Sequence, residues 1–93
     1  MIELILVSGN LEDERKIRDS LIVDRFYYNF LDSNSAYTKK QAYGLKKEWG
    51  AREEPFVLVQ KEDKVLRAFY SESSTNVIDD ALEFIKGLKE TYD

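Results

Sequence analysis

Neighbouring carboxylates are the residues of this chain whose spacing could support chemistry. The candidate groups are Glu12–Asp13–Glu14, Glu53–Glu54 and Asp79–Asp80. Paired carboxylates can serve as general acid and base in catalysis, and they can hold hard cations. Acidic neighbours also have a structural use, because they stabilise the N-terminal end of a helix or keep a surface soluble. No segment has the spacing of a calcium-binding loop, so we expect no metal, no cofactor and no catalytic residue.

Cysteine and histidine are both absent from the 93 residues. Their absence excludes disulfide exchange and thiolate catalysis, and it removes imidazole as an acid or base. It also removes the ligands from which zinc sites are usually built. Ser8 is a conceivable nucleophile, but no histidine or lysine base stands beside it in the sequence. An enzyme built on this chain would have to use carboxylates, hydroxyls, lysine or arginine.

Basic residues are concentrated in one segment, although the whole chain has a formal net charge of −4. Between positions 39 and 52 a single acid, Glu48, stands against five basic residues, which leaves −8 for the rest of the chain. The basic residues are Lys39, Lys40, Lys46, Lys47 and Arg52. The segment is either a solvated helix face or a docking patch for an acidic partner or a phosphate. The negative total argues against nonspecific binding of nucleic acid.

The length and composition predict one soluble domain that spans residues 1–93. Hydrophobic residues make up 43% and charged residues 34% of the chain, as is typical of globular proteins. The longest apolar runs, at 2–7 and 56–59, are too short to span a bilayer. Glu3 interrupts the first run and no basic region precedes it, unlike a signal peptide. We therefore expect a cytoplasmic protein without a membrane partner.

The spacing of apolar residues predicts seven elements in the order β-α-β-α-β-β-α. The expected elements are a strand at 2–7, a helix at 11–22, a strand at 26–31, a helix from 35 or 38 to 49, two strands around a charged turn between 56 and 70, and a helix after 75. In the second strand, alternation places Phe26, Tyr28 and Phe30 on one face. The last helix has the broadest apolar face, which is formed by Val77, Ile78, Ala81, Leu82, Ile85 and Leu88.

Helix ends are marked by residues that commonly cap them. Asn10 is expected to cap the first helix, with Asp13 three positions later, and Thr38 and Gln41 match a capping box for the second. Gly50 is expected to end the second helix in the left-handed conformation.

Two apolar stripes are expected to face the core. Leu11, Ile17 and Leu21 form the stripe of the first helix, and Ala42, Leu45 and Trp49 form that of the second. The alternative for Trp49 is a place beside a binding groove. Gly44 interrupts the second helix at a cost of about 1 kcal/mol relative to alanine, and close packing against the sheet is its expected compensation.

The stretch from Pro55 to Val65 consists of a proline, an apolar strand, a lysine-containing turn and a returning strand. This stretch and the order of elements resemble the minimal thioredoxin-like domain, as in glutaredoxins. The resemblance in element order covers essentially the whole chain. It implies an α/β fold with a four-stranded mixed sheet flanked by three helices. It also implies a cis Glu54–Pro55 bond, whereas the alternative is a trans proline that simply opens a strand.

The sequence departs from this family at its active site. The family places a Cys-x-x-Cys motif where the first strand meets the first helix, and that junction here contains Ser8, Gly9 and Asn10. The family also places glycine after its last strand, where this chain has Tyr70, Ser71 and Glu72. The resemblance therefore implies neither disulfide oxidoreductase activity nor the usual contacts to glutathione.

The resemblance does imply a binding edge for an extended peptide. Ser8, Gly9 and Asn10, the segment Arg52, Glu53, Glu54 and Pro55, and the turn at 71–74 are expected to meet at one end of the sheet. We expect a non-catalytic thioredoxin-like binding or adaptor protein of bacterial or phage origin, whose partner is a protein or peptide rather than nucleic acid. Two alternatives stay open, a thiol-independent enzyme with carboxylates near Asn10 and Glu54, and a partial mimic of nucleic acid.

Overall fold

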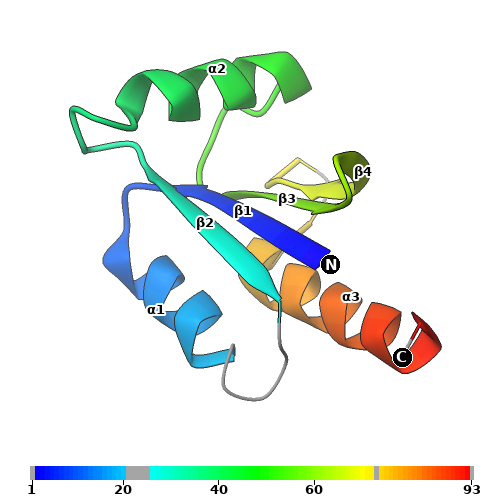
Figure 1. The fold of residues 1–93 in the computed structure, drawn as a ribbon. Coiled ribbons are helices and arrows are strands. Elements are labelled where there is room, and N and C mark those ends of the chain that lie inside the picture. Colours follow the sequence, from blue (N-terminus) through cyan, green and yellow to red (C-terminus); the bar gives the residue numbers. More distant parts are fainter. Residues whose placement is uncertain (1, 21–25, 73, 93) are drawn as a thin grey trace.

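The structure, a computed structural model, describes residues 2–20, 26–72 and 74–92. Its elements follow the order β-α-β-α-β-β-α (Figure 1). They are β1 (Ile2–Ser8), α1 (Leu11–Ser20), β2 (Tyr27–Asp32), α2 (Lys39–Trp49), β3 (Phe56–Lys61), β4 (Lys64–Phe69) and α3 (Val77–Tyr92). The sequence prediction is confirmed in element order, and the last two predicted positions of the first helix, 21 and 22, lie outside the described residues.

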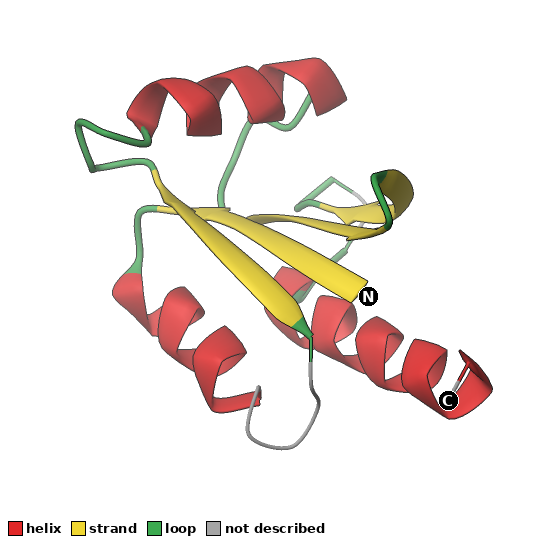
Figure 2. Ribbon diagram, viewed as in Figure 1, coloured by secondary structure: helices red, strands yellow, loops and turns green. Residues whose placement is uncertain are grey.

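The four strands form one mixed sheet in the order β2-β1-β3-β4. β1 and β2 run parallel, and α1 connects them, since parallel neighbours need a crossover. β3 pairs antiparallel with both β1 and β4. Helix α2 covers one face of the sheet, while α1 and α3 cover the other (Figure 2). The structure is thus an α/β fold with a four-stranded mixed sheet and three helices.

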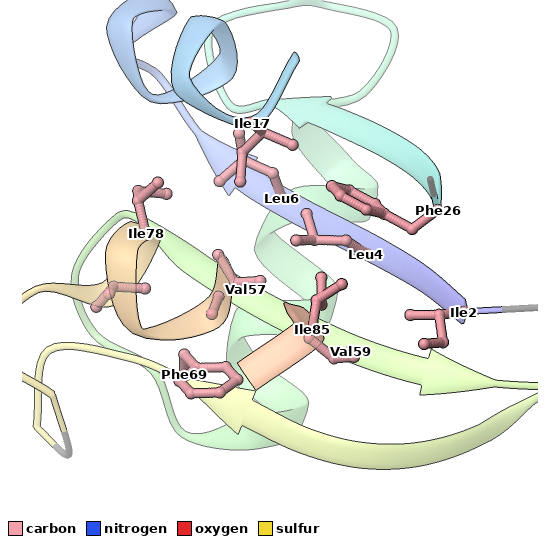
Figure 3. Packing of buried hydrophobic residues seen from close by; sticks show 12 residues of the cluster. Ile2, Leu4, Leu6, Ile17, Phe26, Val57, Val59, Phe69, Ile78 and Ile85 are labelled. Atoms are coloured by element: carbon pink, nitrogen blue, oxygen red, sulfur yellow. The ribbon is translucent and has the colours of Figure 1, made fainter. Parts of the chain in front are cut away.

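The larger hydrophobic core lies between the sheet and helices α1 and α3. Alternate residues of the two central strands point into it, among them Leu4, Leu6, Val57 and Val59. They meet Ile17 from α1, and Ile78 and Ile85 from α3 (Figure 3). Phe26 is buried in this core, while Tyr28 and Phe30 pack against it, as the alternation in β2 predicts.

A smaller core lies on the opposite face, under α2. It contains Val7, Leu31, Ala42, Ala51, Phe56 and Leu58. The central strands are therefore apolar on both faces, as buried strands usually are. This second core is where the packing predictions for α2 are partly wrong. Ala42 is buried and Leu45, though only partly buried, packs against this core, so both face it as expected. Trp49 is 37% exposed, because it lies in the last turn of a helix that stands alone on this face among those described (Figure 2).

Two further predictions about helix packing are wrong. Leu11 is exposed, because it is the first residue of α1 and lies at the end of that helix. Ile17 is the buried residue of α1. Leu21 lies outside the described residues. Gly44 is not tightly packed, since a Cβ built on it would have no described neighbour within 4 Å.

The caps of α2 follow the prediction at one end only. Gly50 has φ of +72° and its backbone N–H donates to the carbonyls of Lys46 and Lys47, so the left-handed cap is confirmed. Thr38 is the N-cap residue, but among the described residues its hydroxyl donates to the Asp32 carbonyl rather than to the helix. The predicted capping box is wrong because the loop before α2 competes for that hydroxyl.

β3 and β4 are joined by a two-residue turn. Both turn residues, Glu62 and Asp63, have positive φ, of 51° and 67°. Such turns match the right-handed twist of the paired strands. The register shifts between Val59 and Gln60, where β4 carries one extra residue. The edge strand β4 is thus bent and carries exposed charge.

Within the described part of the chain, no helix has both the length and the apolar character that crossing a membrane requires.

We predict that Gly44→Ala raises the free energy of unfolding by about 1 kcal/mol, since alanine favours a helix and its methyl group meets open space. Gly50→Ala is the matched control and should lower it by about 1–2 kcal/mol, because φ of +72° strains a residue with a Cβ. Urea unfolding of dilute protein measures both changes. A loss of stability in Gly44→Ala would contradict the open environment of that residue.

Candidate functional site

All four strands end or begin at the same edge of the sheet. Ser8 lies opposite Asp32 at the carboxyl ends of β1 and β2. Phe56, the first residue of β3, pairs with Val7, and Phe69 at the end of β4 pairs with Val57. The β1–α1 junction, the loop after β2, the segment before β3 and the turn after β4 therefore start from one edge, as the sequence predicts. We call this the Pro55 edge.

The Glu54–Pro55 peptide bond is cis, which confirms the prediction. Next to it, the Glu54 carboxylate accepts hydrogen bonds from two other segments. Ser33 Oγ in the loop after β2 donates to Oε1 at 2.8 Å, and Lys46 Nζ of α2 donates to Oε2 at 2.9 Å. Both members of this ion pair are partly buried. Glu54 therefore connects the loop, the helix and the start of β3 at one point.

The pKa of Glu54 lies below the ordinary carboxyl value. Burial of the carboxyl raises the pKa, but the hydrogen bond from Lys46, the hydrogen bond from Ser33 and the charge of Lys46 together lower it by more, with a further contribution from the Gly9 backbone. A general acid or base at neutral pH needs a pKa shifted toward 7. The environment of Glu54 shifts it the other way, so this carboxylate is suited to structure and binding.

Ser8 is buried at the β1–α1 junction, with 1% of its surface exposed. Its Oγ donates to Asp13 Oδ2 at 2.8 Å and accepts from the Asn10 backbone N–H at 2.9 Å. Asn10 Oδ1 accepts from the Glu12 N–H at 2.9 Å, which confirms Asn10 as a helix cap. In a capping box, the side chain three positions after the cap would accept the N–H of the cap residue. Here Asp13 accepts from Ser8 instead, and Ser8 Oγ accepts the Asn10 N–H. Ser8 is held as a structural hydrogen-bonding group that a substrate cannot reach.

Gly9 is the point at which the junction and the loop after β2 come closest. A Cβ on Gly9 would lie 2.8 Å from both Asn34 Nδ2 and Ser33 Oγ. Asn34 Nδ2 donates to the Gly9 carbonyl at 2.9 Å, and the Ser33 N–H donates to the Ser8 carbonyl at 3.1 Å. The junction is therefore closed against this loop, and space for a partner must lie elsewhere on the edge.

That space is a cavity of about 270 Å³ between α2 and the Glu54 carboxylate. Lys39, Tyr43 and Lys46 line it from one side of α2, and Ser33 and Glu54 line it from the edge. The three helix residues are spaced by four and three positions, which places them on one side of a helix. The sequence prediction missed Ser33 and Tyr43. The spacing of Tyr43 between two lysines was a signal that could have found it.

The predicted basic patch is divided by the structure. Lys39, Lys40 and Lys47 are exposed, whereas Lys46 is partly buried against Glu54. Arg52 and Glu53 are exposed beside the edge. The four lysines of α2 against the single acid Glu48 give the helix a net charge of +3.

Two tyrosines that are close to these lysines in the sequence have exposed side chains. Tyr37 is 94% exposed and Tyr43 is 65% exposed.

No close relative defines this site. In comparisons with known proteins, no family model matches the chain, and no curated protein or solved structure is significantly similar to it. Among the described residues, no group of three acidic side chains is placed to hold a metal ion. The site is therefore characterised by its own geometry, a cis-proline edge beside a small cavity with two lysines.

We predict that Glu54→Gln lowers the free energy of unfolding at neutral pH by about 1–3 kcal/mol, because it removes the charge that binds Lys46 and Ser33. A carboxyl whose pKa is lower in the folded state stabilises the fold above its unfolded pKa, and this contribution is lost as the pH falls through the folded pKa. The difference between wild type and variant should therefore be full at neutral pH and shrink below pH 4.5, the ordinary value.

Urea unfolding at a series of pH values measures this difference. Glu53→Gln is the matched control, because Glu53 is exposed and its substitution should change stability by no more than about 0.5 kcal/mol. A stability difference for Glu54→Gln that does not depend on pH would contradict the assigned ion pair.

Proposed function

We propose that this chain is a thioredoxin-like domain that acts by binding, without catalysis, and that docks an acidic segment of a protein partner at the Pro55 edge. Three features support the class of fold. The element order, the strand order β2-β1-β3-β4 and the cis proline that opens β3 beside the β1–α1 junction all agree with it. The absence of cysteine rules out the thiol chemistry that such a scaffold often carries.

The observation that carries the binding function is the cavity between α2 and Glu54. Lys39 and Lys46 both line this small space, and Tyr43 lines it with them. Glu54 already neutralises much of the charge of Lys46 at 2.9 Å. Lys39 lines the cavity and is exposed, so it is the cation that an incoming carboxylate meets first. An aspartate or glutamate side chain of the partner fits this combination of charge and size.

The exposed tyrosines extend the surface beyond the cavity. Tyr37 and Tyr43 place large, rigid and partly apolar side chains in water beside the lysines of α2. Tyrosine is enriched at protein interfaces because it contributes much contact area at a small cost in conformational entropy. We infer that the two rings contact the apolar parts of the partner while the lysines bind its carboxylates.

The distribution of charge favours a protein over nucleic acid as the partner. The first turns of α1 and α3 carry acidic residues, and these helices lie on the face opposite α2 (Figure 1). The basic surface is therefore confined to the face of α2, which leaves little positive surface for a nucleic acid to follow beyond that helix. The same basic helix argues against a mimic of nucleic acid. Against the enzyme alternative stand the buried Ser8 and the lowered pKa of Glu54.

We predict that fluorescently labelled poly-L-glutamate binds the protein and that Lys39→Glu/Lys40→Glu weakens this binding about tenfold. The change replaces attraction by repulsion at Lys39, which lines the cavity, and at its exposed neighbour Lys40. Binding measured by fluorescence anisotropy should weaken as salt is added. The matched control is Lys16→Glu/Lys86→Glu, which changes the net charge equally with exposed lysines of α1 and α3.

Equal weakening by both double variants would show that only net charge matters and would contradict docking at the Pro55 edge. Tighter binding of a single-stranded oligonucleotide than of poly-L-glutamate would overturn the choice of an acidic protein segment.

A further inference from the structure

The two edge strands of the sheet differ in how they are protected. β4 carries Lys64 and Arg67 in exposed positions, and its register with β3 is broken by one extra residue. Exposed charges and bulges are devices that keep a sheet edge from pairing with another strand. β2 lacks both devices from Tyr27 to Leu31, because these residues are uncharged and their register with β1 is regular. Its charged residue, Asp32, is partly buried at the end of the strand. Among the described strands β2 pairs with β1 alone, so its outer edge can accept another strand.

A groove of about 340 Å³ lies beside β2 on the face covered by α2. Ile5 and Leu31 provide apolar walls, and Gln41 and Glu48 form a polar border. Gly44 also borders the groove, and the space exists in part because this residue has no side chain. The groove and the lysine cavity lie on different sides of α2, since residues 41, 44 and 48 line the first and residues 39, 43 and 46 line the second.

Tyr27 is an exposed aromatic residue on the same strand. It is 61% exposed, and by alternation it lies on the same face of β2 as Asn29 and Leu31, which border the groove. Tyr27 is the first residue of β2, whereas Leu31 lies under α2 near the other end. One subunit therefore carries on a single edge both a protruding ring and an open groove at the opposite end of the same strand.

We propose that two copies of this chain pair through their β2 edges, antiparallel, with Tyr27 of each copy in the groove of the other. Antiparallel pairing about a two-fold axis at Tyr28 or Asn29 places Tyr27 directly opposite Asn29 or Leu31 of the second copy. Residues directly opposite each other are about 4.5–5.5 Å apart at Cβ and lie on the same face. The ring therefore arrives at the groove border in either register.

The chemistry of the groove suits a tyrosine. Ile5 and Leu31 contact the ring, while the Glu48 carboxylate and the Gln41 amide can accept the phenol hydroxyl. The chain already contains one such pair, because the Tyr28 hydroxyl donates to the Glu14 carboxylate. Because the residues from Tyr27 to Leu31 are uncharged, none of them faces a like charge on the second copy across the two-fold axis. A two-fold interface of this kind is closed, and the protected β4 edges prevent further growth.

The contact area sets the strength of this dimer. A strand of six residues is about 20 Å long, and each tyrosine ring adds at most roughly 150–250 Å². The total falls at the low end of specific interfaces, below about 1,200 Å², where complexes are weak and reversible. We therefore expect monomer and dimer to exchange in the micromolar range of concentration.

Sedimentation velocity from about 1 µM to about 1 mM tests the proposal, since a small interface dissociates within that range. Wild type should pass from monomer to dimer. Asn29→Lys places two charges near the axis, and Gly44→Leu fills the groove while favouring the helix, so both variants should remain monomeric. Tyr27→Ala should weaken the dimer about tenfold. Leu66→Lys on the exposed face of β4 is the matched control and should dimerise as wild type does.

Amide hydrogen exchange gives a second readout, in which rising concentration protects β2 but not β4. Wild type that stays monomeric at about 1 mM overturns the proposal, and so does an edge that pairs only with a strand of another protein. A dimer that survives in Asn29→Lys, or that is lost in Leu66→Lys, also overturns it. The dependence on salt distinguishes this dimer from the docking of acidic segments. Added salt screens the repulsion between two copies of charge −4 and so favours the dimer, whereas it weakens the binding of poly-L-glutamate.

Discussion

The ion pair between Glu54 and Lys46 is the interaction on which the geometry of the Pro55 edge depends. One carboxylate accepts hydrogen bonds from the loop after β2 and from α2, and it belongs to the residue that precedes the cis proline. Because both charges are partly removed from water, each needs the other as a partner. This pair joins α2 to the start of β3 beside the cavity, while Ala42 and Leu45 pack the same helix on the sheet and the groove lies on its other side.

The elements and the cores follow from patterns that can be read along the chain. The apolar runs of β1 and β3 and the broad apolar face of α3 are local patterns, and the structure keeps them. Asn10 and Gly50 cap their helices through bonds to near neighbours, so their residue types were enough to identify them. Thr38, Leu11 and Trp49 could not be placed in this way, because their roles depend on a competing carbonyl or on which element covers a face.

The candidate site was only partly predictable for the same reason. The sequence marked Glu54 as an acidic docking residue and Lys46 as part of a basic patch, but their contact depends on how α2 lies over the edge. Ser33 had no signal in a loop rich in polar residues. Gly9 was marked only as part of a junction, whereas its closeness to Ser33 and Asn34 is what leaves no room there for a partner.

Gly44 links the fold to the two proposed interfaces. Glycine inside a helix costs about 1 kcal/mol relative to alanine, and the described structure offers no packing at this position that would offset the cost. A position that lowers stability without a local benefit is often one that serves binding. If Tyr27 of a second copy fills the groove, the missing side chain becomes the space which that ring needs. The opposite side of α2 would stay open at the Pro55 edge, so one helix would serve a symmetric contact and an acidic partner at the same time.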